Sequence, residues 1–170
     1  MDQLIIDATK AKDKLISEMN TVILSTVSKA QFPNSSYAPA FVDDNNNFYV
    51  YISSLSKHTR NLLENPIVSI MIIEDESECE NIFGRKRFTM DANAEEIKRD
   101  SDEWITIIDS MEGKFGDTIK YLKDMTDFYL FKFKPHKGLL VHGFARAFRF
   151  YGEKLEKIDY MNDKGHTAKK

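Results

Sequence analysis

The spacing of apolar residues changes from a helical period to a strand period near residue 20. A helical period, with charges between the apolar positions, covers residues 3–19 and predicts an amphipathic helix. The β-branched run TVILSTVS (21–28) predicts a strand. A second, short helix is expected in SKHTRNLLENP (56–66), where Ser56 can cap the N-terminus and Pro66 ends the helix after Asn65.

Further strands follow from β-branched, aromatic and alternating segments. The segments SSYAPAFVDD (35–44) and NFYVYIS (47–53) are separated by Asp and Asn residues that favour a turn, so we expect a hairpin. IVSIMII (67–73) predicts a buried strand, and RFTMDANAEEI (87–97) alternates as a half-buried strand does. DFYLFKFKP (127–135) and GLLVHGFARAFRF (138–150) predict two last strands, joined by a tight KPHKG turn.

Two helices are expected between these strands. The first begins with Asp100 and Glu103 at capping-box spacing and ends at Gly113, and a short second one covers 117–125. The chain has no internal repeat, and its 170 residues suit one domain. Six or seven strands with short helices predict a mainly β fold with flanking helices (α+β), an antiparallel barrel followed by a flexible tail over about 152–170.

Composition narrows the classes of function. The net charge of −3 argues against a general nucleic-acid binder, which needs a basic face. The single cysteine excludes an intramolecular disulfide framework and a multi-cysteine metal site, and it suits a reducing compartment. No stretch is apolar enough to span a membrane, and the first 20 residues are too charged for a signal peptide, so we expect a cytoplasmic protein.

Cationic residues gather in two segments that can bind an anion. The sequence lacks a P-loop, a GxGxxG, a nucleophile elbow and an HExxH. Lys57, His58 and Arg60 open the short helix, where free backbone amides favour a phosphate or a carboxylate; a solvated helix start is the alternative. In GRKRF, Arg85 and Arg87 share one face and can reach one pocket, or both lie at the surface.

Histidine and aspartate supply the other candidates. Asp127 precedes an apolar run, where its carboxylate either orients an imidazole or caps a strand. Because no two of the four histidines have metal-ligand spacing on one helix, a zinc site is not expected. His142 suits a core or an interface, and His166, by itself, suits a silent tail.

Four segments in order carry a resemblance to a known family. They are SKHTRNLLENPIVSIMIIEDE, ENIFGRKRFTM, DFYLFKF and GFARAF, within a match that runs from about Thr21 to Tyr151. The chain resembles the split-barrel proteins related to pyridoxamine-phosphate oxidase and, within them, the bacterial haem-utilisation branch. The resemblance implies a split β-barrel and a homodimer with two sites at the subunit interface.

The resemblance also assigns roles to individual residues. It implies that His166 is the axial ligand of haem iron, that Arg87 lies in the haem pocket, and that Asp127 hydrogen-bonds the ligating histidine across the dimer interface. The helix start at Lys57, His58 and Arg60 then holds haem propionates, or the phosphate of FMN in flavin-binding relatives.

The function expected from this resemblance is haem binding and haem degradation. A haem oxygenase-like enzyme opens the porphyrin ring of iron protoporphyrin IX with an electron donor and releases iron. An FMN-dependent oxidoreductase and a non-catalytic haem carrier or storage protein are the alternatives.

Overall fold

The computed structural model describes residues 2–144 and 146–161. Its helices are α1 (Asp2–Glu18), α2 (Lys57–Glu64), α3 (Asp102–Phe115), α4 (Asp117–Leu122) and two 3-10 turns, η1 (Glu76–Glu78) and η2 (Ile82–Gly84). Its strands are β1 (Thr21–Val27), β2 (Pro33–Pro39), β3 (Phe41–Val42), β4 (Phe48–Ser53), β5 (Ile67–Ile73), β6 (Arg87–Ile97), β7 (Phe128–Val141), β8 (Ala147–Tyr151) and β9 (Lys157–Tyr160). Among these described residues, no helix is both long and apolar enough to cross a membrane.

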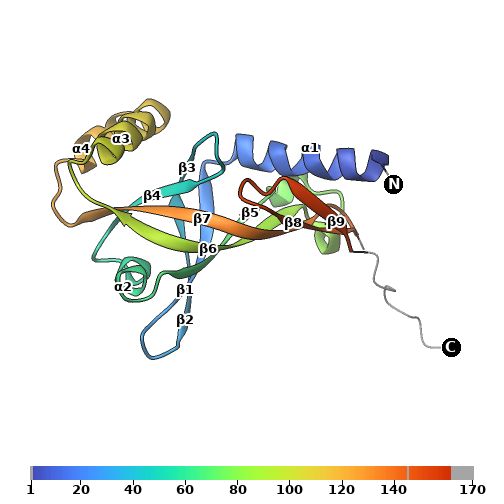
Figure 1. The fold of residues 1–170 in the computed structure, drawn as a ribbon, viewed down its shortest axis with the longest axis horizontal. Helices are drawn as coiled ribbons and strands as arrows, with labels where there is room; N and C mark the ends of the chain where they lie inside the picture. Colours follow the sequence, from blue (N-terminus) through green and yellow to red (C-terminus); the bar gives the residue numbers. More distant parts are fainter. Residues whose placement is uncertain (1, 145, 162–170) are drawn as a thin grey trace.

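One curled antiparallel sheet organises the chain. Its main path runs β2-β1-β5-β6-β7-β4-β3, and β8 and β9 extend it from β7. The two longest strands, β6 and β7, pair with each other and run side by side through the middle of the molecule (Figure 1). The predicted mainly β architecture, an antiparallel split barrel with flanking helices, is confirmed.

The sheet curls around the larger of two apolar cores. Alternate residues of the strands point inward and pack with Ala8 and Ile16 of α1 and with Met19, which follows that helix. Strand β4 is buried on both faces, because its other side lies under α3 and α4 in a second core with Trp104 and Ile108. Helices α3 and α4 therefore cover the end of the sheet where β7 begins (Figure 1).

The last two strands differ from the prediction, because KPHKG is not a turn. Strand β7 continues through it, and a register shift opposite Asp91 and Ala92 leaves His136 as a bulged residue. Pro135 has no N–H to donate, and the bulge accommodates it without ending the strand. The real turn follows His142, where Gly143 has a φ of 102°.

Smaller differences concern boundaries. Ser101, not Asp100, caps α3 by accepting the N–H of Trp104, and α3 continues past Gly113 to Phe115. The segment 35–44 does not form one strand: β2 pairs with β1, and β3 pairs with β4. Strand β9 lies inside the predicted tail, so a tail beginning at 152 is wrong, whereas 162–170 lies outside the described residues.

Candidate functional site

Asp127 and the start of α2 lie together at one end of the sheet. Ser53, the last residue of β4, donates its hydroxyl proton to Oδ2 of Asp127 over 2.6 Å. The backbone N–H of Ser54 donates to the carbonyl of Asp127 over 2.8 Å, and α2 begins at Lys57 within the same turn. The two predicted features, a carboxylate at a strand mouth and a cationic helix start, therefore lie next to each other.

The start of α2 has an exposed cation and an uncapped first turn. Ser56 occupies the N-cap position, but its side chain makes no capping hydrogen bond. Lys57 is exposed and forms no ion pair within the described part of the chain. Arg60 donates from Nη1 to the carbonyls of Ser54 (3.1 Å) and Leu55 (2.8 Å), which braces the turn. Free amides and a lysine together suit an anionic group.

His58 lies on the opposite, buried side of α2. Its Nδ1 is 2.9 Å from the hydroxyl of Ser36, and its buried Nε2 has no hydrogen-bond partner among the described residues. Burial lowers the pKa of His58 below its usual value. The ring therefore favours the neutral form and packs into the fold, whereas Lys57 and Arg60 face solvent.

Arg87 lies at the other end of the long β6–β7 ladder. It pairs with Val141, whereas Phe128, the neighbour of Asp127, pairs with Ser53. Val141 is 13 residues after Phe128 (141 − 128), which is about 40 Å along a strand that rises about 3.3 Å per residue. Within one chain, the two predicted catalytic side chains do not meet.

The predicted pair of guanidinium groups does not form either. Arg85 donates from Nε to the carbonyl of Glu74 (2.7 Å) and pairs through Nη1 with Glu76 (2.9 Å). Arg87 donates from Nη1 to the carbonyl of Arg85 over 2.9 Å. The guanidinium of Arg85 is consequently bound to Glu74 and Glu76, and Arg87 is the arginine of GRKRF that remains for a pocket.

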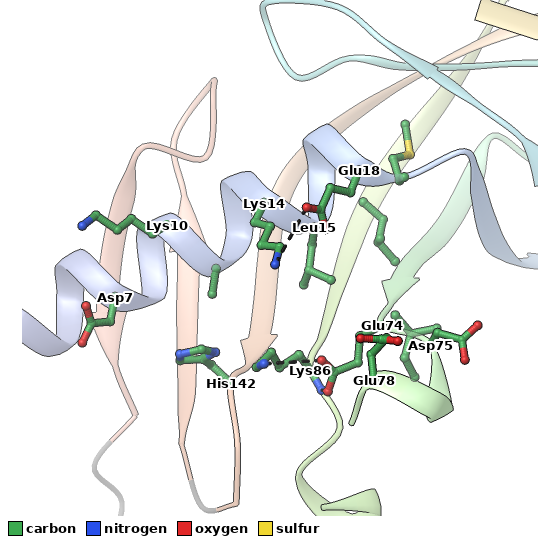
Figure 2. Close-up of a pocket in the computed structure, with 14 residues that line it drawn as sticks. Asp7, Lys10, Lys14, Leu15, Glu18, Glu74, Asp75, Glu78, Lys86 and His142 are labelled. Carbon is green, nitrogen blue, oxygen red and sulfur yellow. Dashed lines mark hydrogen bonds and ion pairs between the residues drawn. The ribbon is translucent and has the colours of Figure 1, made fainter. Parts of the chain in front are cut away.

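A cavity of about 600 Å³ lies beneath α1, away from the Asp127 site (Figure 2). Ala11, Leu15 and Ile72 supply apolar lining, and two ion pairs, Lys86–Glu74 at 3.5 Å and Lys14–Glu18 at 3.8 Å, line it as well. The cavity was not predicted from the sequence, because charges at helical spacing on α1, such as Asp7, Lys14 and Glu18, are equally typical of a solvated helix face.

His142 contributes the imidazole of this cavity. Its Nδ1 is buried without a partner among the described residues, and burial, followed by the charges of Lys86 and Arg146, lowers its pKa. His136 is exposed in the bulge of β7, and no group of three His, Cys, Asp or Glu residues in the described ranges can hold a metal ion. His166, the predicted iron ligand, lies outside the described residues.

The convex face of the sheet carries a row of side chains, called here the apolar row, that are apolar except for Thr89. The strand registers align Tyr37, Ile23, Met71, Thr89 and Leu139 across β2, β1, β5, β6 and β7. These residues alternate with the core positions, so they point away from the core; Tyr37 is 64% and Leu139 40% exposed. An apolar row of this kind is typical of a surface that another chain covers.

Three comparisons with known proteins agree on one family. The family model for pyridoxamine 5'-phosphate oxidase matches residues 8–142. Heme oxygenase HutZ of Vibrio cholerae is 43% identical over 150 residues, which are 88% of this chain and 84% of HutZ.

Solved structures give the same result. A crystal structure of Vibrio cholerae HutZ, described there as a heme storage protein, has a TM-score of 0.70 at 42% identity and covers 73% of this chain and 87% of that one. Campylobacter jejuni ChuZ has a TM-score of 0.78 at 32% identity, and the match covers 86% of this chain and 60% of ChuZ. The chain therefore belongs to the pyridoxamine 5'-phosphate oxidase family, in the branch that contains HutZ and ChuZ.

Proposed function

We propose that this chain is a cytoplasmic, homodimeric haem-degrading protein that binds haem and opens its porphyrin ring to release iron. The observation that carries the proposal is the carboxylate of Asp127, which Ser53 holds through Oδ2 while Oδ1 has no partner among the described residues. Such a carboxylate can accept the N–H of an imidazole and strengthen that imidazole as an iron ligand. The 43% identity to a heme oxygenase supports the same reading.

The groups around Asp127 fit haem better than FMN. Lys57 and the uncapped start of α2 suit a single carboxylate, such as a haem propionate. The carboxylate of Asp127 is held against the same turn through Ser53 and Ser54, and it repels a phosphate dianion more strongly than a monoanion. The donor set therefore favours haem, and FMN remains the second candidate because of the family.

A complete site needs two chains. Asp127 and Arg87 lie at opposite ends of the β6–β7 ladder, so a pocket that contains both takes one residue from each of two subunits. The apolar row on the convex face of the sheet gives these subunits a surface to share. We propose that His166, carried by the C-terminal segment, would bind the haem iron next to the Asp127 of a partner chain.

Each protein group then has a separate task. Haem, when bound, supplies the redox chemistry of ring opening with an electron donor and dioxygen or peroxide. Asp127 orients the imidazole of His166, and Lys57 fixes a propionate. Arg87 would provide positive charge and hydrogen-bond donors within the same pocket.

Hemin titration tests the ligand. The purified protein should give a sharp Soret band with hemin, and His166→Ala should lose that band, whereas His136→Ala, a change at an exposed histidine, should keep it. An unchanged spectrum in His166→Ala would remove His166 from the site. A yellow protein with flavin absorption as purified would favour the FMN alternative.

Turnover separates degradation from storage. With ascorbate and oxygen, and with catalase present to remove free peroxide, the Soret band should decay in the wild type and far more slowly in Asp127→Asn. A band that persists in both proteins would indicate a haem carrier instead.

The oligomeric state tests the two-chain site. Leu139→Glu, on the convex face, should convert the dimer to a monomer in light scattering. Ile105→Glu on α3 is the matched control, because Ile105 is similarly exposed but lies outside that face. A monomeric wild type would contradict the two-chain site.

A further inference from the structure

The backbone on both sides of Asp127 is anchored by one arginine. Arg99 lies just after β6 and stacks over Trp104, with its guanidinium 5.2 Å from the ring centre. The guanidinium donates to four oxygens, which are Tyr51 Oη (2.8 Å) and the carbonyls of Lys123 (2.8 Å), Met125 (2.6 Å) and Phe128 (3.2 Å). With the bond from the Ser54 N–H to the Asp127 carbonyl, these contacts fix where the Cα of Asp127 lies.

The side chain of Asp127 is held by a different residue. The 2.6 Å bond from the Ser53 hydroxyl to Oδ2 is the one hydrogen bond that this carboxylate makes to the described residues. An ionised carboxylate only accepts, so the hydroxyl must donate. The hydroxyl oxygen of Ser53 also accepts the N–H of Leu55 over 3.1 Å. This bond occupies a lone pair of the oxygen and leaves the O–H free to point toward Asp127.

We propose that Ser53 is a positioning residue for the haem site: it holds Asp127 by Oδ2 so that Oδ1 faces the incoming imidazole. The inference rests on the proposed function, in which Asp127 orients the imidazole that binds iron. Ser53 in turn orients Asp127. Asp127 is only half-buried, so packing alone leaves several χ1 rotamers open to it. A charge-assisted hydrogen bond selects one of them before the ligand binds.

The first test needs no haem. Three-bond couplings that report χ1 of Asp127 in isotope-labelled, ligand-free protein should indicate one rotamer in the wild type and rotamer averaging in Ser53→Ala. Ser53→Thr retains the hydroxyl and should restore the single rotamer. Ser54→Ala is the matched control, since the side chain of Ser54 makes no bond to Asp127. A fixed rotamer in Ser53→Ala would overturn the proposal whether or not haem binds.

The second test measures the ligand bond in the haem-loaded protein. In resonance Raman spectra of the ferrous form, Asp127→Asn should lower the iron–histidine stretching frequency, because a weaker acceptor leaves the imidazole a weaker donor. Ser53→Ala should shift the band part of the way in the same direction, and Ser53→Thr should return it to the wild-type position. No shift, or a shift in the opposite direction, in Ser53→Ala would overturn the positioning role.

The double variant shows whether Ser53 acts through Asp127. Adding Ser53→Ala to Asp127→Asn should not move the band further, whereas a merely structural role of Ser53 gives an additional shift and contradicts the proposal. If Asp127→Asn itself leaves the band unchanged, the orienting role of Asp127 fails and Ser53 loses its role at the haem site. A shift with Asp127→Asn but not with Ser53→Ala removes Ser53 alone.

Discussion

At the Asp127 end of the β6–β7 ladder, α3 and α4 cover the strands and Arg99 donates to three backbone carbonyls, whereas the Arg87 end consists of loops. There η2 and the turn after β7 meet through backbone, and Ile82, Phe83 and Phe144 are exposed. Strong directional bonds at one end set the direction of a carboxylate before a ligand arrives. The exposed side chains at the other end suit completion by a second surface.

Substituting one arginine at each end, Arg99 and Arg85, should give the largest difference in the free energy of unfolding. Arg99→Met leaves several carbonyls of the 123–128 loop without a donor, and we expect a loss of about 3 kcal/mol in the free energy of unfolding. Arg85→Met removes one backbone bond and an ion pair to an exposed glutamate, and should cost about 1 kcal/mol. Urea unfolding followed by circular dichroism measures both, and equal losses would contradict the difference between the ends.

The next largest loss of stability is expected from a substitution of Gly84, at the Arg87 end. A Cβ on Gly84 would lie 2.5 Å from the backbone nitrogen of Phe144, so Gly84→Ala must push two loops apart. We expect a loss of about 2 kcal/mol, as for other overpacked sites. The control Gly113→Ala lies within α3 with no atom close to its new Cβ, and should instead stabilise by about 0.5 kcal/mol because alanine favours helix. An unchanged unfolding midpoint in Gly84→Ala would show that the two loops yield easily.

The smallest effect is expected from His58 and His142, as a pH dependence of the stability to which both ends contribute. Burial lowers the pKa of His58 and of His142 in the folded protein, so the unfolded chain binds more protons below about pH 6.5. The stability that their neutral forms contribute is present above that pH and is lost as the pH falls toward 5.

Urea midpoints between pH 7.5 and 5 measure this dependence. His58→Gln and His142→Gln should each flatten part of the slope, and the exposed His136→Gln should leave it unchanged. A slope that survives both substitutions would assign the acid sensitivity to other groups.

Local patterns predicted most elements, because their signals lie within a few residues. The helical period of α1, the alternation of β6 and the proline after α2 are all short-range features, and the structure confirms them. The KPHKG segment misled the prediction for a physical reason. Turn-forming residues also suit a bulge, and the choice between them depends on whether a neighbouring strand continues, as β6 does here.

The sequence by itself determined the element types, the family and the residues with chemical potential, because composition, periodicity and motif order are written along the chain. Only the tertiary structure decided how these residues combine. It bonds Asp127 to Ser53, close to the start of α2, and it pairs Arg85 with Glu76. It also places Arg87 and Asp127 at opposite ends of the β6–β7 ladder. The physical reason is that hydrogen bonds between residues as distant as Ser53 and Asp127 follow from strand register, which local sequence does not encode.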